Sequence, residues 1–421
     1  MIHTTKLQNG IRGIVVPMKG VKAATALVLV RTGSKYETKR TNGVAHFVEH
    51  MIFKGSKKYP SVRKLTETLD RLGAEYNAFT SKEMTGYWVK AAGEKRGKVL
   101  EIVASMLRDP LFPRGELERE RGVILQELNL YFDTPARFIH DLWEKLLWGD
   151  QPAGWHVGGT PQSVGQITYK DLSAFFKTHY VGHATVVCLA GAAQQADLNP
   201  MRKLFSKIGA GEQHQHSKIQ EEQTHPQVLV YYKKTDQTHI DLGFRAVSLT
   251  HPMRYALAVL ATVLGGTMSS RLFLELRDKL GLAYSVKTET FFDTESGYLV
   301  TSAGVKHEYL EKAIRAVLAA YHHAKKYPPA REELMKAKEA MLGRFVLDLE
   351  QTDEVASYVA TNALLLNKYE SAEEEMRRLK QVTARQIQEA ARLFFTPERL
   401  NFALIGPYRD KKPFYKLLNN F

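Results

Sequence analysis

The chain repeats part of its own pattern at a fixed offset, and this repeat limits the folds that it can adopt. A segment that runs from Thr168 to the end of an apolar strand at Gly191 resembles a second segment that runs from Thr383 to Gly406. Thr383 lies 215 positions after Thr168, and Gly406 lies 215 positions after Gly191. Self-similarity at a long, fixed period indicates a duplicated structural unit. The sequence therefore predicts two similar domains.

A polar segment separates the two predicted domains. At 421 residues the chain is too long for one ordinary hydrophobic core. Residues 209–226 are rich in Gln, Glu and His and end in proline, as expected of an exposed connection. We therefore predict an N-terminal domain over 1–208, a linker over 209–226 and a C-terminal domain over 227–421.

Within each half, strand and helix patterns are mixed rather than strictly alternating. Residues 14–31 contain two β-branched runs, which predict a strand pair. A helix capped by Asn42 is expected to end near Gly55, with strands over 76–92 and a further helix over 116–130. This order favours an α+β fold, in which each domain has a mainly antiparallel sheet packed with helices.

The charge balance does not indicate a nucleic-acid-binding protein. The formal net charge is +14 and the isoelectric point is near 9.5. The basic residues are scattered in short runs, often beside acidic residues, instead of forming one basic face. We expect no nucleic-acid partner, although a general preference for acidic partners stays open.

Cysteine usage and the N-terminal sequence restrict the metal chemistry and the location. Cys188 is the only cysteine, so a cysteine-based zinc site or an intrachain disulfide is excluded. A metal would have to be bound by histidine and carboxylate. The N-terminus lacks a secretory signal, and we expect no run of membrane-spanning length. A cytoplasmic protein without membrane contact is the expectation.

One short motif has the spacing of a metal site. His46-Phe47-Val48-Glu49-His50 places two imidazoles four residues apart on one face of a helix, where both could bind a single Zn²⁺. Glu49 precedes the second histidine and could accept a proton from an attacking water. Five residues are weak evidence alone, because His46 and His50 could equally be structural residues of an amphipathic helix.

A third ligand would decide between these interpretations. Glu127 lies on the helix expected over 116–130, and Glu120 stands two helical turns earlier on the same face. Glu127 could complete the metal shell, while Glu120 supports a ligand or a water.

With these residues the chain resembles the pitrilysin and mitochondrial processing peptidase family of inverted-motif zinc proteases. The resemblance covers almost the whole chain, including Asn77-Ala78 and the segment Gly281-Leu282-Ala283-Tyr284. It implies the following roles: zinc ligands His46, His50 and Glu127, general base Glu49, supporting glutamate Glu120, and substrate-binding residues Asn77, Ala78, Arg277 and Tyr284.

The resemblance also implies a mode of action. One Zn²⁺ per chain would serve the hydrolysis of peptides or unfolded segments inside an enclosed chamber. Family members with four domains form such a chamber from one chain, so this two-domain chain is expected to form a homodimer. Arg277 and Tyr284 would act as donors toward the developing oxyanion, although from the residues alone they read equally well as a solvated helix residue and a half-buried strand residue.

Other functions stay open at this stage. A non-catalytic assembly subunit of the same fold is the main alternative, and the complete motif argues against it. If the protein is an enzyme, nothing in the sequence distinguishes a role in presequence processing from a role in the general degradation of oligopeptides.

Overall fold

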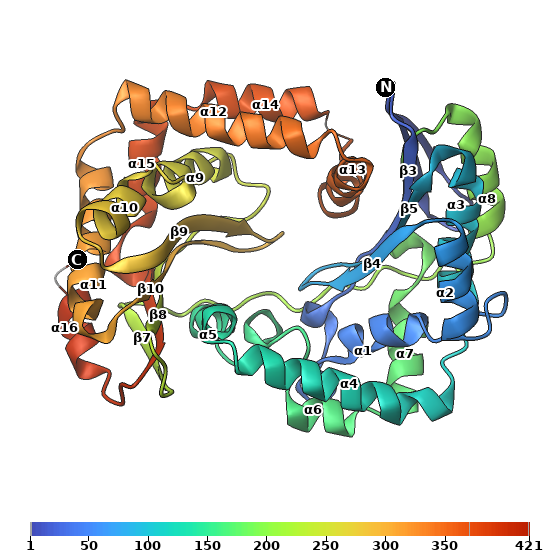
Figure 1. Ribbon diagram of the computed structural model, residues 1–421, viewed down its shortest axis with the longest axis horizontal. Coiled ribbons are helices and arrows are strands. Elements are labelled where there is room, and N and C mark those ends of the chain that lie inside the picture. The colour runs from blue at the N-terminus through green and yellow to red at the C-terminus, as the bar shows by residue number, and fades with distance from the viewer. Residues whose placement is uncertain (1, 370, 420) are drawn as a thin grey trace. The chain divides into compact units, whose positions relative to one another are not determined.

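Two β-sheets organise the chain, one in each of two units (Figure 1). The computed structural model describes residues 2–369, 371–419 and 421. The units are discontinuous in sequence. The first comprises Met1–Asn129, Trp155–Ser217 and Val346–Ser371, and the second comprises Leu130–Gly154, Lys218–Phe345 and Ala372–Phe421.

The first unit has a six-stranded sheet, in which only the pairing of β2 with β6 is parallel. In spatial order its strands are β1 (His3–Lys6), β2 (Arg12–Pro17), β6 (Thr185–Gly191), β3 (Ala23–Val30), β5 (Thr85–Ala92) and β4 (Glu75–Thr80). The helices are α1 (Val44–Ile52), α2 (Val62–Arg71), α3 (Arg96–Arg108), most of α4 (Arg114–Phe132), α6 (Pro161–Gln166), α7 (Tyr169–His179), α8 (Leu198–Phe205) and α13 (Thr352–Leu366).

Helices cover both faces of the first sheet, as alternation along the central strand β3 requires. Leu27 and Leu29 point to one face and pack in a buried cluster with Val355 and Val359 of α13. On the opposite face α3 packs against β3 and β5 (Figure 1). Since β4 closes the order of the sheet, one edge of β4 has no strand beside it among the described residues.

The second unit has a five-stranded sheet, in which only the pairing of β7 with β11 is parallel. Its spatial order is β7 (Gln227–Tyr232), β11 (Leu400–Gly406), β8 (Thr238–Arg245), β10 (Gly297–Val305) and β9 (Ala283–Phe292). The helices are α5 (Pro135–Trp148), α9 (Arg254–Ala261), α10 (Arg271–Phe273), α11 (Leu310–Lys326), most of α12 (Arg331–Asp348), α14 (Ala372–Gln381), α15 (Ala384–Phe394) and α16 (Lys412–Leu418).

Alternation along β11 divides the core of the second unit into two clusters. Phe402 and Leu404 belong to a large cluster that contains residues of α9, α11 and α15. Ala403 and Ile405 pack instead in a second cluster with Trp143 of α5. Both faces of this sheet are therefore covered, as in the first unit.

The repeat seen in the sequence extends to the element boundaries. Three strand pairs and one helix pair begin and end 215 residues apart: β2 and β7, β3 and β8, β6 and β11, and α7 and α15. Two further helix pairs, α4 with α12 and α5 with α13, begin 217 residues apart. The prediction of two duplicated α+β units with mainly antiparallel sheets is confirmed.

The compact units differ from the continuous halves 1–208 and 227–421. Helix α5 belongs to the N-terminal half of the sequence but packs on the second sheet, and α13 belongs to the C-terminal half but packs on the first. The linker 209–226 has no helix or strand, and the division between the units falls within it, after Ser217. Each exchanged helix buries its apolar face on a sheet that comes from far along the chain.

The expected pairing of the strands within 14–31 is wrong. Both strands form, as β2 and β3, but β6 lies between them and pairs with each. All seven residues of β6 are buried, and a fully buried strand is most stable at the centre of a sheet, covered on both faces. A long-range strand insertion therefore replaces the local hairpin.

One segment resembles a membrane-spanning helix in length and composition, although no run of that length was expected. Arg254–Lys279 is long and apolar enough by length and composition, with a mean hydropathy of 1.5 in its most apolar window. Half of that window is buried inside the second unit. Gly265 leaves the helical conformation, and residues 267–270 are not helical. These features are typical of a core segment made of shorter helices.

Candidate metal centre

Helix α1 presents two histidines on one side and an apolar surface on the other. Phe47, Val48 and Met51 of this helix are fully buried, and their packing fixes its orientation. His46 and His50 lie one turn apart on the opposite side and are partly exposed. Their Nε2 atoms are 3.2 Å apart. The predicted pair of imidazoles therefore converges on one point.

A buried glutamate holds the start of α1. Glu37 accepts hydrogen bonds from the backbone N–H groups of Gly43 and Ala45, each at 2.8 Å, and from the Asn42 side chain. Burial raises the pKa of Glu37 to about 8, and these hydrogen bonds act against that rise. The two oxygens of this carboxyl group satisfy N–H groups that have no partner within the helix. Asn42 was expected to cap the helix, but it binds Glu37 instead, and Gly43 is the N-cap with φ 96°.

Glu127 of α4 completes the cluster. Its Oε2 lies 3.7 Å from Nε2 of His46 and 3.5 Å from Nε2 of His50. One tetrahedral Zn²⁺ with bonds of about 2.0–2.1 Å would hold its ligand atoms about 3.3–3.4 Å apart. The three observed separations are close to this value, so the residues fit a single ion. Among the described residues, this is the one group of His, Cys, Asp and Glu whose ligand atoms converge in this way.

Glu120 lies behind the cluster, in contact with His50. Its Oε2 is 3.2 Å from Nδ1 of His50, and its Oε1 is 2.5 Å from Nζ of Lys54. A carboxylate on Nδ1 fixes the ring so that Nε2 faces the ion. The supporting position of Glu120 follows from its helical spacing with Glu127, whereas nothing in the sequence indicated Lys54 as its partner.

The electrostatic environment shifts the pKa of each residue of the cluster. Burial and the neighbouring His50 lower the pKa of His46 to about 4, so this ring is neutral and able to bind metal near pH 7. Burial opposes protonation of His50, but hydrogen bonds that its ring donates to the carboxylates of Glu127 and Glu120 outweigh burial and raise its pKa. The same hydrogen bond with His50 lowers the pKa of Glu127. The centre therefore has a carboxylate and a neutral imidazole facing one point.

Glu49 lies on α1 between the two histidines in sequence and is partly buried. Burial raises the pKa of its carboxyl group, and a hydrogen bond from the Thr80 hydroxyl, at 2.5 Å, partly offsets the rise. Its charge also interacts with His50 and Glu127. A carboxylate with a raised pKa beside a metal cluster can accept a proton from water near neutral pH.

The two residues predicted to bind substrate near the metal lie on β4. Asn77 and Ala78 occupy the middle of this strand, which pairs through one edge with β5 and ends the sheet with the other. Both are at least partly accessible. The Asn77 side chain accepts a hydrogen bond from the N–H of Ala78 at 2.9 Å. An extended peptide could add to this edge through main-chain hydrogen bonds.

Arg277 and Tyr284 belong to the second unit, while the metal cluster belongs to the first. Arg277 lies in a π-helical segment, Leu274–Lys279, and its guanidinium stands over two aromatic rings. It is 5.0 Å from the centroid of Phe273 and 5.3 Å from that of Tyr284. Tyr284 is the second residue of the edge strand β9 and is 77% exposed. The two predicted residues therefore form one contact surface with a free phenol.

The second half of the duplication has no ligand set of this kind. Residues 259–267, at the 215-residue offset from α1, contain no histidine and no acidic residue. At the 217-residue offset of α12 from α4, Ala337 and Arg344 stand where Glu120 and Glu127 stand in the first half. Within the part of the chain that the structure describes, the converging cluster therefore occurs in the first half of the repeat and not in the second.

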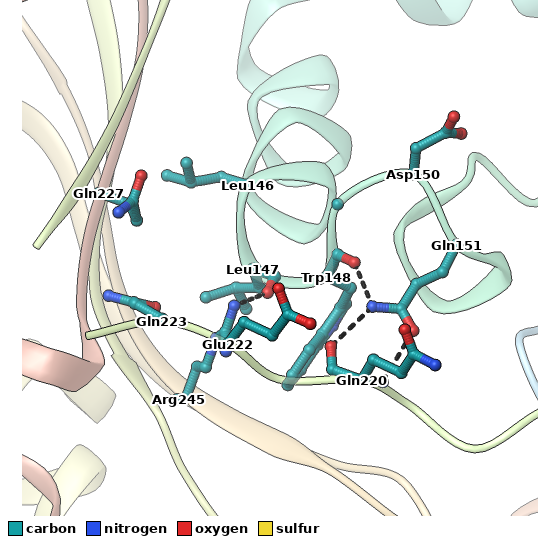
Figure 2. Close-up of a pocket in the computed structure, with 11 residues that line it drawn as sticks. Leu146, Leu147, Trp148, Asp150, Gln151, Gln220, Glu222, Gln223, Gln227 and Arg245 are labelled. Atoms are coloured by element: carbon teal, nitrogen blue, oxygen red, sulfur yellow. Dashed lines mark hydrogen bonds between the residues drawn. The ribbon is translucent and has the colours of Figure 1, made fainter. Parts of the chain in front are cut away.

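A separate pocket of about 420 Å³ lies in the second unit (Figure 2). Glutamines line much of it, and their amides are used within the protein. Gln151 donates to the carbonyls of Trp148 and Gln220, and Gln223 donates to that of Leu400. Arg245 donates to the carbonyl of Leu147 at the end of α5. This pocket contains none of the residues predicted to form the site.

The fold and the cluster together define a two-domain protein of the inverted-motif metallopeptidase class. Family models agree: that of "Insulinase (Peptidase family M16)" matches residues 14–160, and that of "Peptidase M16 inactive domain" matches residues 166–341. The chain belongs to this family, the pitrilysin family, as a two-domain member of the bacterial type.

Relatives of similar length carry the same class name. The chain is 33% identical to "Uncharacterized zinc protease YmxG" of Bacillus subtilis, over 97% of this chain and 98% of that protein. It is 30% identical to an uncharacterized zinc protease of Streptomyces coelicolor, over 98% and 91%. These names associate the chain with a metallopeptidase and with zinc.

Two solved structures share the fold. A protease from Helicobacter pylori superposes with a TM-score of 0.90 at 22% identity, covering 97% of this chain and 99% of the other. A structure titled "peptidase M16 inactive domain" from Pseudomonas fluorescens gives 0.89 at 20% identity, covering 98% and 99%. Because the relatives are uncharacterized and the family has inactive members, catalysis by this chain is a proposal.

Proposed function

We propose that the protein is a zinc-dependent endopeptidase that hydrolyses peptides or unfolded polypeptide segments. One observation carries the proposal: Nε2 of His46, Nε2 of His50 and Oε2 of Glu127 converge at separations that match the shell of one ion, and Glu49 lies on the same helix. The contacts of Glu120 with His50 and of Glu37 with the start of α1 hold this arrangement in place, which supports a catalytic subunit over a non-catalytic one.

Each residue has a role in the proposed reaction. His46, His50 and Glu127 would hold Zn²⁺, which when bound polarises a carbonyl and lowers the pKa of water. Glu49 accepts the proton of the attacking water and then returns it to the leaving amine. In this proposal Arg277 and Tyr284 donate hydrogen bonds toward the developing oxyanion, and the edge of β4 at Asn77 and Ala78 aligns the peptide.

Metal analysis and chelation test the proposal. Protein purified without chelator should contain about one zinc per chain, because the second half of the repeat lacks the ligands. A chelator should remove both the zinc and the cleavage of a quenched fluorescent peptide, and added zinc should restore both. His225→Ala, at an exposed histidine of the second unit, is the matched control and should keep both. Protein without zinc or cleavage would instead indicate a non-catalytic assembly subunit.

The proposed substrates are unfolded chains. We infer an enclosed chamber, as the resemblance implies, so that folded proteins would be cleaved poorly. The net charge of +14 fits a processing enzyme for basic presequences less well than it fits a general oligopeptidase. Profiling a peptide library separates these roles. We also propose a cytoplasmic location, without a membrane or nucleic-acid partner.

We further propose a homodimer in which the Arg277 surface of one chain serves the metal centre of the other. Co-expressed Glu49→Gln and Arg277→Ala chains, purified through two different tags, test this arrangement. A dimer with sites shared between chains would keep one intact site, so about half of the wild-type activity should return. Two variants inactive alone and inactive together would contradict shared sites, and a fully active monomer in light scattering would contradict the dimer.

A further inference from the structure

Glu49 has a partner that comes from the sheet instead of from its own helix. The Thr80 hydroxyl donates to Oε2 of Glu49 at 2.5 Å. Thr80 is the last residue of β4, whereas Glu49 lies on α1, so the contact joins two elements. A short hydrogen bond from a neutral hydroxyl to a carboxylate is among the stronger protein hydrogen bonds.

The backbone around Thr80 is held from several sides. Thr80 pairs with Thr85 in the β4–β5 ladder. In the turn that follows, the N–H and the hydroxyl of Ser81 both donate to the carbonyl of Met84, each at 2.9 Å. The carbonyl of Ser81 in turn accepts a hydrogen bond from the N–H of Ser34 at 3.1 Å. The Thr80 hydroxyl is therefore a fixed donor and not a mobile surface group.

A base that has to reach a water needs a defined orientation. The glutamate carboxyl group rotates broadly about its last torsion, so a single anchor on Oε2 selects one orientation and leaves Oε1 to meet the proton. Thr80 also follows Asn77 and Ala78 on the same strand, whose outer edge is the proposed place for the peptide. The strand that aligns the substrate thus carries the group that aligns the base.

We propose that Thr80 is a positioning residue, which holds Glu49 in the orientation needed for proton transfer and couples it to the strand proposed to bind the peptide. This inference rests on the proposed endopeptidase function. A 1 Å misplacement of a catalytic group can cost about 10²-fold in rate, so the effect should appear in kcat.

Two substitutions separate the hydroxyl from the shape of the side chain. Thr80→Val keeps the β-branched shape and removes the donor, while Thr80→Ser keeps the donor. In the zinc-loaded enzyme, Thr80→Val should lower kcat roughly 10- to 100-fold with KM and zinc content near those of the wild type. Thr80→Ser should stay within about threefold of the wild type.

A control and a spectroscopic measurement exclude a general loss of structure. Thr85→Val removes a buried hydroxyl that donates to the carbonyl of Thr32, just beyond the end of β3, and it should lower the melting temperature while kcat is kept. In zinc-free protein, the infrared carboxylate stretch assigned to Glu49 should shift in Thr80→Val and not in Thr80→Ser, because only the first loses the hydrogen bond.

Several results would overturn the role of Thr80. These are a Thr80→Val enzyme with kcat within twofold of the wild type, a Thr80→Ser enzyme as slow as Thr80→Val, loss of zinc from Thr80→Val, or an unshifted carboxylate stretch. If the wild type neither holds zinc nor cleaves peptide, the proposed function fails instead. The infrared measurement on zinc-free protein still decides whether Thr80 binds Glu49, so the two failures are distinguishable.

Discussion

Glu49→Gln is expected to reduce peptide hydrolysis by about 10²–10⁴-fold and to leave zinc in place. The amide has nearly the shape of the carboxylate and can still accept the hydrogen bond from Thr80, but it cannot accept a proton from water. The ligands His46, His50 and Glu127 are untouched. The measurement is kcat on a quenched peptide, made beside zinc analysis of the same sample.

The outcome separates chemistry from folding. Unchanged zinc content, an unchanged melting temperature and an unchanged Kd for a peptide, together with the loss of kcat, would assign the proton transfer to Glu49. A substitution at Glu75, an exposed residue at the start of β4, is a matched control, and Glu75→Gln should retain activity. Full turnover by Glu49→Gln would exclude Glu49 as the base, and a loss of zinc would show that the substitution disturbs the ligands.

The parts of the fold that depend on local pattern could be predicted, and those that depend on long-range packing could not. The helix that carries His46 and His50 has apolar residues at helical spacing, so its position and direction followed from the sequence. The repeat predicted two similar sheets, because the offset of 215 is retained by strands and helix alike. The insertion of β6 between β2 and β3 pairs residues that are 155 to 174 positions apart, which no local pattern records.

The exchange of α5 and α13 has the same cause. Each helix has an apolar face that fits the surface of a sheet, and the two sheets are products of one duplication with similar surfaces. The sequence therefore shows that each helix packs on a sheet but not on which one. In the structure Trp143 of α5 packs beside Ile405, and Val359 of α13 packs beside Leu29.

In the candidate site, too, the local relations could be predicted and the long-range contacts could not. The spacing within the motif placed His46, His50 and Glu49 on one helix, and the spacing along α4 placed Glu120 on the face of Glu127, because these relations are helical and local. The resemblance to the family, and no local pattern, linked Glu127 to the histidines. Glu37, Lys54 and Thr80 were missed. Each contacts its partner only in the tertiary structure. For Glu37 the sequence offers one signal, a charged residue between a strand and a helix, and the structure shows that this residue is buried.

Glu127→Gln is expected to weaken zinc binding and to remove most activity in protein dialysed against a weak chelator. Oε2 of Glu127 is the one carboxylate oxygen among the three converging atoms, and an amide oxygen is a weaker ligand without charge. Two imidazoles alone would then face the ion. The affinity loss should exceed the roughly 10- to 100-fold typical of removing a supporting residue. Competition with a fluorescent chelator measures it.

Substitutions at two other glutamates of α4 give zinc affinities with which the Glu127→Gln result can be compared. Glu120→Gln removes the carboxylate behind His50 and leaves all three ligand atoms, so its zinc affinity should fall by about 10- to 100-fold. The Glu118 side chain is 73% exposed and pairs with Arg121, so Glu118→Gln should bind zinc as the wild type does. This order, with Glu127 weakest and Glu118 unchanged, is required if Glu127 is a ligand and Glu120 its support. Equal affinities for the Glu127 and Glu118 variants would leave two histidines without a third ligand, and the proposed chemistry of α1 would have to be abandoned.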